Sequence, residues 1–145
     1  MSDRNIKLQK LFLEKKFTEI IDIIESIDKS EKRSAGLLNL LGASKLSRNS
    51  KEKNDLYSAN LIFKTAYLQE KESNYGLESL INYLNTTADI FDENIDQKSS
   101  NFIEETEVFF NEAEVFFGFN EKLILAMIRI YKRQNNLEKI LFYIK

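Results

Sequence analysis

Two neighbouring stretches decide the fold of this chain: Leu38-Asn39-Leu40-Leu41-Gly42-Ala43 and Ala59-Asn60-Leu61-Ile62-Phe63-Lys64-Thr65-Ala66. In both, apolar residues recur three or four positions apart, which is the spacing of one face of an α-helix. Gly42 and Ala59 are small residues that stand among large ones. A small residue in one helix that faces a large one in its neighbour lets two backbones approach closely. The stretches therefore predict two closely packed helices.

Helical periodicity extends over nearly the whole chain, and strand-like alternation appears nowhere for long. Because the chain has no proline, glycine, asparagine, aspartate and serine must supply the breaks. The pattern predicts eight helices, over residues 3–15, 18–28, 34–47, 55–70, 74–91, 101–117, 121–133 and from about 136 to the end. It also predicts an enlarged turn over residues 47–54 and a loop over the acidic, polar residues 92–100.

Several helix ends carry recognisable residues. Asn101 followed by Glu104 has the spacing of a capping box. Asn120 and Asn135 are placed to cap the seventh and eighth helices, and Gly118 fits the left-handed position that ends the sixth. Short helices joined by tight turns favour antiparallel hairpins.

The second helix of each predicted pair repeats one spacing, a residue followed by others four and seven positions later. The occurrences are Ile20, Ile24, Ile27; Ala59, Phe63, Ala66; Thr106, Phe110, Ala113; and a last one that begins with Ile140 and Ile144. Thr106 and Ile140 are 34 residues apart.

This pattern resembles the tetratricopeptide repeat, a helix–turn–helix unit of 34 residues. The match is clearest in the two stretches quoted first, and the segment from Tyr131 to Ile140 is similar. The chain departs from the family in the long gap between Gly42 and Ala59, in the insertion at 92–100 and in the missing helix-ending proline. The resemblance implies an all-α, right-handed solenoid of about four antiparallel helix hairpins, as one domain over residues 1–145. Because apolar residues at helical spacing also mark core faces, another helical array or an irregular bundle is the alternative.

Composition excludes several kinds of chemistry. The 145 residues suffice for one domain with its own core and include no cysteine and no histidine. Disulfides, thiolate zinc sites, cysteine or histidine catalysis and a serine triad are therefore ruled out. The glutamates of the sixth helix find no matching ligands on a second helix, so we interpret them as a solvated face. We expect no enzyme activity, no cofactor and no metal.

Charge and hydropathy limit the partners. The net charge is −2, and the sequence pI near 5.4 argues against nucleic-acid binding. The longest apolar run, residues 123–128, is too short to cross a bilayer, and the polar residues 1–5 lack the apolar core of a signal peptide. We therefore expect a cytoplasmic protein that binds no membrane. The bias towards lysine, asparagine and isoleucine hints at a bacterial origin.

The sixth helix is apolar over an unusually wide arc. Phe110 and Phe117 lie seven positions apart and share a face that we expect to be core. Phe109 and Phe116 form a second stripe beside them. Such a wide apolar arc indicates contact on two sides of the helix.

By the resemblance, the first helix of each pair lines the inner wall of a curved array, which holds an extended peptide or a partner helix. Transferring the family's positions gives a predicted partner-binding set of Asn5, Gln9, Asn39, Asn82, Asn85, Lys122, Arg129 and Lys132. An asparagine amide both donates and accepts hydrogen bonds, which suits a peptide backbone. The basic residues suit a carboxylate. Solvated polar faces are the alternative, because asparagine is common throughout the chain.

The last helix leaves an apolar surface, Leu141 to Ile144, where arrays normally carry a polar cap. The chain is then a module of a longer protein, a homodimer that associates through Phe142 and Tyr143, or a bundle closed by this helix. We expect a non-catalytic protein–protein interaction or scaffolding module. The alternative, also from resemblance, is an N-terminal assembly or substrate-positioning module of a bacterial transferase that acts on sugars, sulfate or methyl groups.

Overall fold

A computed structural model describes residues 3–27, 33–48, 54–93 and 100–144, and over these residues the chain is all-α. The described helices are α1 (Asp3–Leu13), α2 (Phe17–Glu25), α3 (Ala35–Ser47), α4 (Asp55–Gln69), α5 (Asn74–Glu93), α6 (Ser100–Phe117), α7 (Glu121–Arg133) and α8 (Leu137–Ile144). The prediction of an all-α chain is confirmed, and each predicted helix is present within a few residues of its expected bounds.

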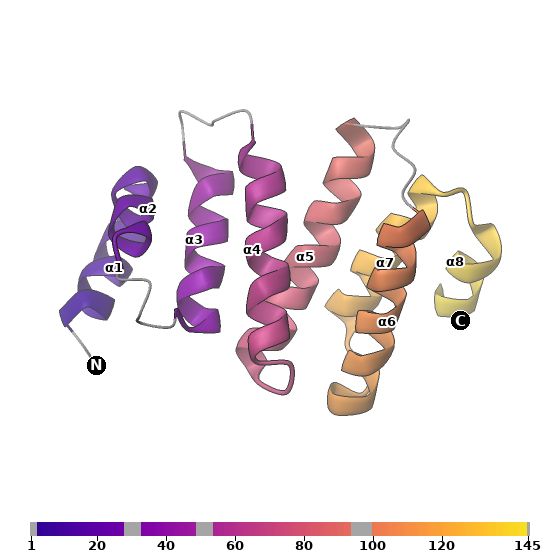
Figure 1. Cartoon of the computed structure of the whole chain (residues 1–145). Coiled ribbons are helices and arrows are strands. Elements are labelled where there is room, and N and C mark those ends of the chain that lie inside the picture. Colours follow the sequence, from indigo (N-terminus) through magenta and orange to yellow (C-terminus); the bar gives the residue numbers. More distant parts are fainter. Residues whose placement is uncertain (1–2, 28–32, 49–53, 94–99, 145) are drawn as a thin grey trace.

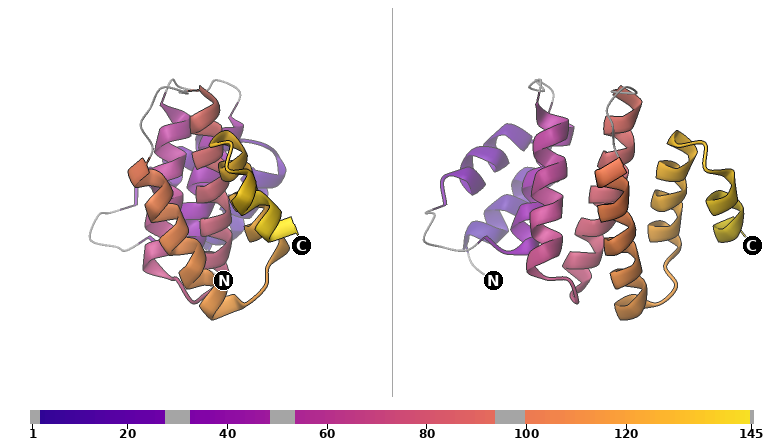
Figure 2. Two further views of the ribbon diagram at one scale, coloured as in Figure 1. Left: turned by 90° about the vertical axis from the view of Figure 1, so that its right-hand side faces the viewer. Right: turned by 45° about the vertical axis from the view of Figure 1, so that its right-hand side comes forward.

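The helices follow one another across the molecule in chain order, and the termini lie at opposite ends (Figures 1 and 2). From α3 to α8, successive helices run alternately up and down in Figure 1. The helix α4 packs between α3 and α5, whereas α5 also packs against α3 and α7. At the far end, α8 packs against α7.

The repeated spacing found in the sequence marks the core. All nine residues of its first three occurrences are buried, including Ile20, Phe63 and Phe110. The fourth occurrence differs, because Ile140 is half-buried and Ile144 is exposed. One apolar cluster joins α1, α2 and α3, and a larger one joins α4 to α7. The core is therefore elongated along the row of helices.

The close approach predicted for Gly42 is confirmed. A Cβ atom placed on Gly42 of α3 would lie only 2.6 Å from Cε1 of Phe63 on α4. The absent side chain thus makes room for the aromatic ring, which is buried. Across the segment that joins the same two helices, the guanidinium of Arg48 forms a buried ion pair with the Asp55 carboxylate, with Nε 2.9 Å from Oδ2. The end of α3 is thereby tied to the start of α4.

The helix ends follow the sequence, with corrections at the starts of α6 and α8. The Asn120 side chain accepts a hydrogen bond from the Leu123 amide (3.0 Å), and Gly118 has the left-handed φ of +68°. The cap of α8 is Asn136 rather than the predicted Asn135, because Asn136 Oδ1 accepts from the Lys139 amide and Asn135 itself is left-handed (φ 55°). The helix α6 already begins at Ser100, so Asn101 lies inside the helix and is not the residue before it, as a capping box with Glu104 would require. The central parts of the predicted segments 47–54 and 92–100 lie outside the described part of the chain.

Candidate interaction surface

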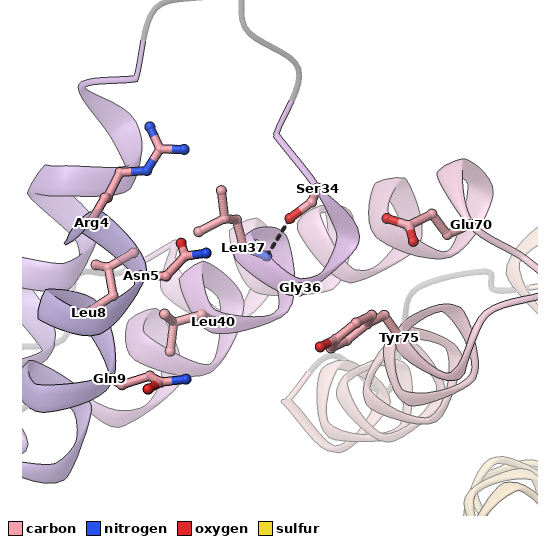
Figure 3. Close-up of a pocket in the computed structure, with 10 residues that line it drawn as sticks. All are labelled: Arg4, Asn5, Leu8, Gln9, Ser34, Gly36, Leu37, Leu40, Glu70 and Tyr75. Atoms are coloured by element: carbon pink, nitrogen blue, oxygen red, sulfur yellow. Dashed lines mark hydrogen bonds between the residues drawn. The ribbon is translucent and has the colours of Figure 1, made fainter. Parts of the chain in front are cut away.

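A pocket of about 490 Å³ lies where α1, α3 and the start of α5 converge. Figure 3 shows residues of α1 on one side, Tyr75 and Glu70 on the other, and α3 between them. Its lining residues are Arg4, Asn5, Leu8, Gln9, Ser34, Gly36, Leu37, Leu40, Glu70 and Tyr75. The pocket is thus lined by leucine side chains, by two side-chain amides and by Tyr75, which is 57% exposed. Such a mixed lining can accept both the apolar and the hydrogen-bonding groups of a ligand.

The α3 wall of the pocket is held by hydrogen bonds at its first turn. The Ser34 hydroxyl accepts from the Leu37 amide at 3.2 Å, and the Glu70 carboxylate accepts from the Ala35 amide at 2.8 Å. A carboxylate at a helix N-terminus also interacts favourably with the helix dipole. The turn between α4 and α5 is tight as well, because a Cβ on Gly76 would lie 1.8 Å from the Glu70 carbonyl oxygen. These contacts place Glu70 and Tyr75 opposite α1.

Asn39 supports this pocket from behind. Its side chain is buried between α3 and α5, where Nδ2 donates to the Tyr75 carbonyl oxygen (3.1 Å) and Oδ1 accepts from the Ser79 hydroxyl (2.8 Å). The predicted peptide-binding amide is therefore engaged in joining two helices. We leave Asn39 out of the candidate surface and regard it as a residue that positions the backbone of Tyr75.

The predicted residues on α5 and α7 form a separate group. Asn82 and Asn85 are half-buried, and Asn85 Oδ1 accepts from Arg129 Nη1 at 2.8 Å. Arg129 also donates from Nη2 to Asp89 Oδ1 at 2.7 Å, so an acidic neighbour offsets its charge. Lys122 and Lys132 are exposed on α7.

A second ion pair extends the contact between α5 and α7. Arg133 donates to both carboxylate oxygens of Asp92, with Nη2 2.9 Å from Oδ2. The hydrogen bond from Arg133 holds the pKa of the Asp92 carboxyl below its usual range, and the same bond raises the pKa of Arg133. Four charged side chains on these two helices thus serve helix packing.

Of the predicted partner-binding residues, only Asn5 and Gln9 line the pocket. Sequence reasoning missed Arg4, Glu70 and Tyr75. Gly76 was a usable signal, since glycine permits a close approach of two backbone segments that a Cβ atom would block. The partner of Glu70, the Ala35 amide, lies 35 residues away and leaves no local pattern.

The two predicted self-association residues differ in their surroundings. Phe142 is 70% exposed. Tyr143 is half-buried, and its ring meets Phe110 edge-on (centroids 5.4 Å apart) and stacks on Tyr131 (6.1 Å). Tyr143 thus anchors α8 to the rest of the molecule, and Phe142 is the one of the two that faces solvent.

Comparisons with protein families, curated proteins and solved structures give no match for this chain. Within the described ranges, no group of three or more aspartate or glutamate side chains is arranged to hold a metal ion. None of the described helices combines the length and apolarity that a membrane span requires.

Proposed function

We propose that this chain is a non-catalytic protein-interaction module, built as a tetratricopeptide-like array of four helix hairpins. In this arrangement α1, α3, α5 and α7 are the first helices of the pairs. The observation that carries the proposal is the pocket between α1, α3 and α5, because it lies between first helices and includes Asn5 and Gln9. The recurrence of buried positions in α2, α4 and α6 supports the repeat.

The lining of the pocket suits a short extended peptide. The Gln9 amide offers both a donor and an acceptor to a peptide backbone, whose own groups repeat along the strand. The Tyr75 ring and the Leu37 and Leu40 side chains offer apolar area to one side chain of the peptide. Each hydrogen bond contributes about 0.5–1.5 kcal/mol net, so affinity must come from several contacts together.

A mapping experiment tests this function. The full chain, labelled with ¹⁵N, is titrated with pools of random eight-residue peptides, and amide chemical shifts are followed by NMR. We expect shifts of residues in α1, at the start of α3 and around Tyr75. The variants Gln9→Ala and Tyr75→Ala should weaken binding, whereas Gln134→Ala, an exposed residue on the last turn before α8, should not. Shifts confined to other helices, or no saturable binding by any pool, would refute the proposed site.

A further inference from the structure

The outer face of α4 and α6 carries a regular row of side chains, which we call the α4–α6 seam. It comprises Leu61, Lys64 and Leu68 of α4, Lys71 in the turn that follows α4, and Glu105, Val108, Glu112 and Val115 of α6. The residues within each helix are three or four positions apart, so they form a stripe along one side of that helix, and Lys71 follows the α4 stripe in the next turn. In Figure 1 these two helices face the viewer, with α5 set back between them.

Ion pairs form the floor of the seam. Lys64 pairs with Glu105, and Lys71 pairs with Glu112 with Nζ 2.9 Å from Oε2. The helices themselves stay apart, since no Cα of α4 comes within 8 Å of a Cα of α6 in the described residues. Beneath the ion pairs, the ring of Phe109 fills the gap, with its centroid 5.1 Å from that of Tyr67. The floor is therefore charged but paired.

Apolar side chains form the two rims. Leu61 is 63% exposed and Leu68 47% on one rim, and Val108 is 56% and Val115 82% exposed on the other. At one end the seam opens into a hollow of about 490 Å³ that includes Leu68, Lys71 and Phe116. Exposed apolar side chains gathered on one face favour an interaction site.

The surroundings of the seam are acidic. Between residues 103 and 117, α6 carries five glutamates and no lysine or arginine. Glu104 lies one helical turn before Val108, and Glu72, in the turn after α4, lines the hollow together with Leu68, so an exposed carboxylate lies near each rim. A helix that docks here therefore needs two apolar residues about two turns apart, with basic residues beside them.

The outer face of α1 has these properties. Ile6 is 53% exposed and Leu13 83%, and the two lie seven positions apart, opposite the buried Leu8 and Leu11. The exposed Lys7 and Lys10 lie beside them. Seven residues of helix span about 10.5 Å, which is the same separation as between Leu61 and Leu68 or between Val108 and Val115.

We infer that the outer face of α1 from one copy of this chain docks on the α4–α6 seam of a second copy. Ile6 and Leu13 lie between the apolar rims, and Lys7 and Lys10 bring positive charge to a face that carries the exposed carboxylates Glu72 and Glu104. The two surfaces are different, so the contact is heterologous: two copies exchange α1 faces reciprocally, or copies add in a chain. This inference uses neither the peptide pocket nor Phe142, so its outcome is independent of the proposed function.

Sedimentation velocity of the full chain at increasing concentration tests the inference. We expect association that weakens as salt is raised from about 0.05 M to 0.5 M, because exposed charges are then screened. K7E/K10E should reduce association at least tenfold, and so should E72K/E104K. The matched control is K122E/K132E, which changes the net charge by the same amount at exposed positions of α7.

A charge swap makes the test decisive. A mixture of K7E/K10E with E72K/E104K should associate again, because the unchanged α1 of the second variant meets the unchanged seam of the first, and the reversed α1 of the first meets the reversed seam of the second. Far-UV circular dichroism checks that each variant remains helical. Three results would each overturn the inference: a wild-type monomer up to about 1 mM, equal weakening by the α7 control, or no recovery in the mixture.

Discussion

The helices α4 and α8 show that apolar composition does not decide burial in this molecule. Six of the eight residues of α8 are apolar, yet none is buried, and Leu137, Leu141, Phe142 and Ile144 are all at least half exposed. By contrast, α4 buries an aspartate and an asparagine together with its apolar residues. The difference lies in the neighbours, because α4 packs between α3 and α5 whereas α8 packs against α7 at one end of the row.

The polar residues of α4 are tolerated because they have partners. Asn60 Nδ2 lies within hydrogen-bond distance of the Thr86 and Thr87 hydroxyls, at 2.9 and 3.0 Å, and of the Tyr83 carbonyl oxygen, at 3.2 Å. Buried polar groups without partners would cost free energy. Two flanking helices therefore supply both the apolar contacts and the hydrogen bonds that a central helix needs.

The largest expected effect on stability comes from a comparison of Phe63 in α4 with Phe142 in α8. Phe63→Ala should lower the free energy of unfolding by about 3–5 kcal/mol, because it leaves a cavity beneath Gly42. Phe142→Ala should change it by less than about 0.5 kcal/mol, since that ring is exposed. Urea unfolding followed by circular dichroism measures both. If Phe63→Ala is too unstable for a complete curve, Phe63→Leu gives a smaller loss in the same direction. Similar losses at the two positions would contradict the comparison.

Two glycines of α3 contrast a position in close contact with a neighbouring helix and a position with room for a Cβ atom. Gly42→Ala should cost about 1–3 kcal/mol, since the new Cβ collides with the buried Phe63 ring. Gly36→Ala should instead stabilise the protein by up to about 1 kcal/mol, because its Cβ meets the Tyr75 ring at an ordinary 3.5 Å and alanine favours the helix. In the Gly42→Ala background, Phe63→Leu should recover part of the loss. A purely additive double-mutant cycle would show that the two positions are not in close contact.

Asn39 and Gln9 contrast a residue that joins two helices with a residue that we propose binds a peptide. Asn39→Ala should lower the free energy of unfolding by about 1–2 kcal/mol, since it removes two hydrogen bonds between α3 and α5 and leaves the Ser79 hydroxyl with fewer partners. Gln9→Ala, at an exposed position, should leave the unfolding curve unchanged. Thermal and urea unfolding of both variants provide the measurement. Unchanged stability in Asn39→Ala would return Asn39 to the list of binding candidates.

The sequence predicted the helices better than the candidate surface, for a physical reason. Helical periodicity, the cap at Asn120 and the left-handed Gly118 are local properties that a few consecutive residues determine. The environment of Asn39 depends on Ser79, 40 residues away, and the charge of Arg129 is offset by Asp89 on another helix. Packing between helices therefore determines which polar residues face solvent. Gln9 was predicted as a surface residue because it needs no distant partner.

The smallest expected effect concerns the ion pair between α5 and α7. Arg133 holds the pKa of Asp92 below its usual range, so the pair stabilises the fold above about pH 4. This stabilisation is lost as the pH falls through the lower, folded-state pKa, because the carboxylate is then protonated. Both side chains are partly exposed, so Arg133→Ala should cost only about 0.5 kcal/mol at pH 7 and progressively less as the pH falls below about 4.

Urea unfolding of the wild type and of Arg133→Ala at several pH values measures this difference, and Lys132→Ala serves as the control at an adjacent exposed position. A loss of several kcal/mol, or a loss that grows in acid, would show that Arg133 acts mainly through packing of its stem. The expected small effect fits the contrast between α4 and α8. Contacts at the solvent-exposed edge add little to the free energy of unfolding. The central helices contribute more because they are covered on both sides.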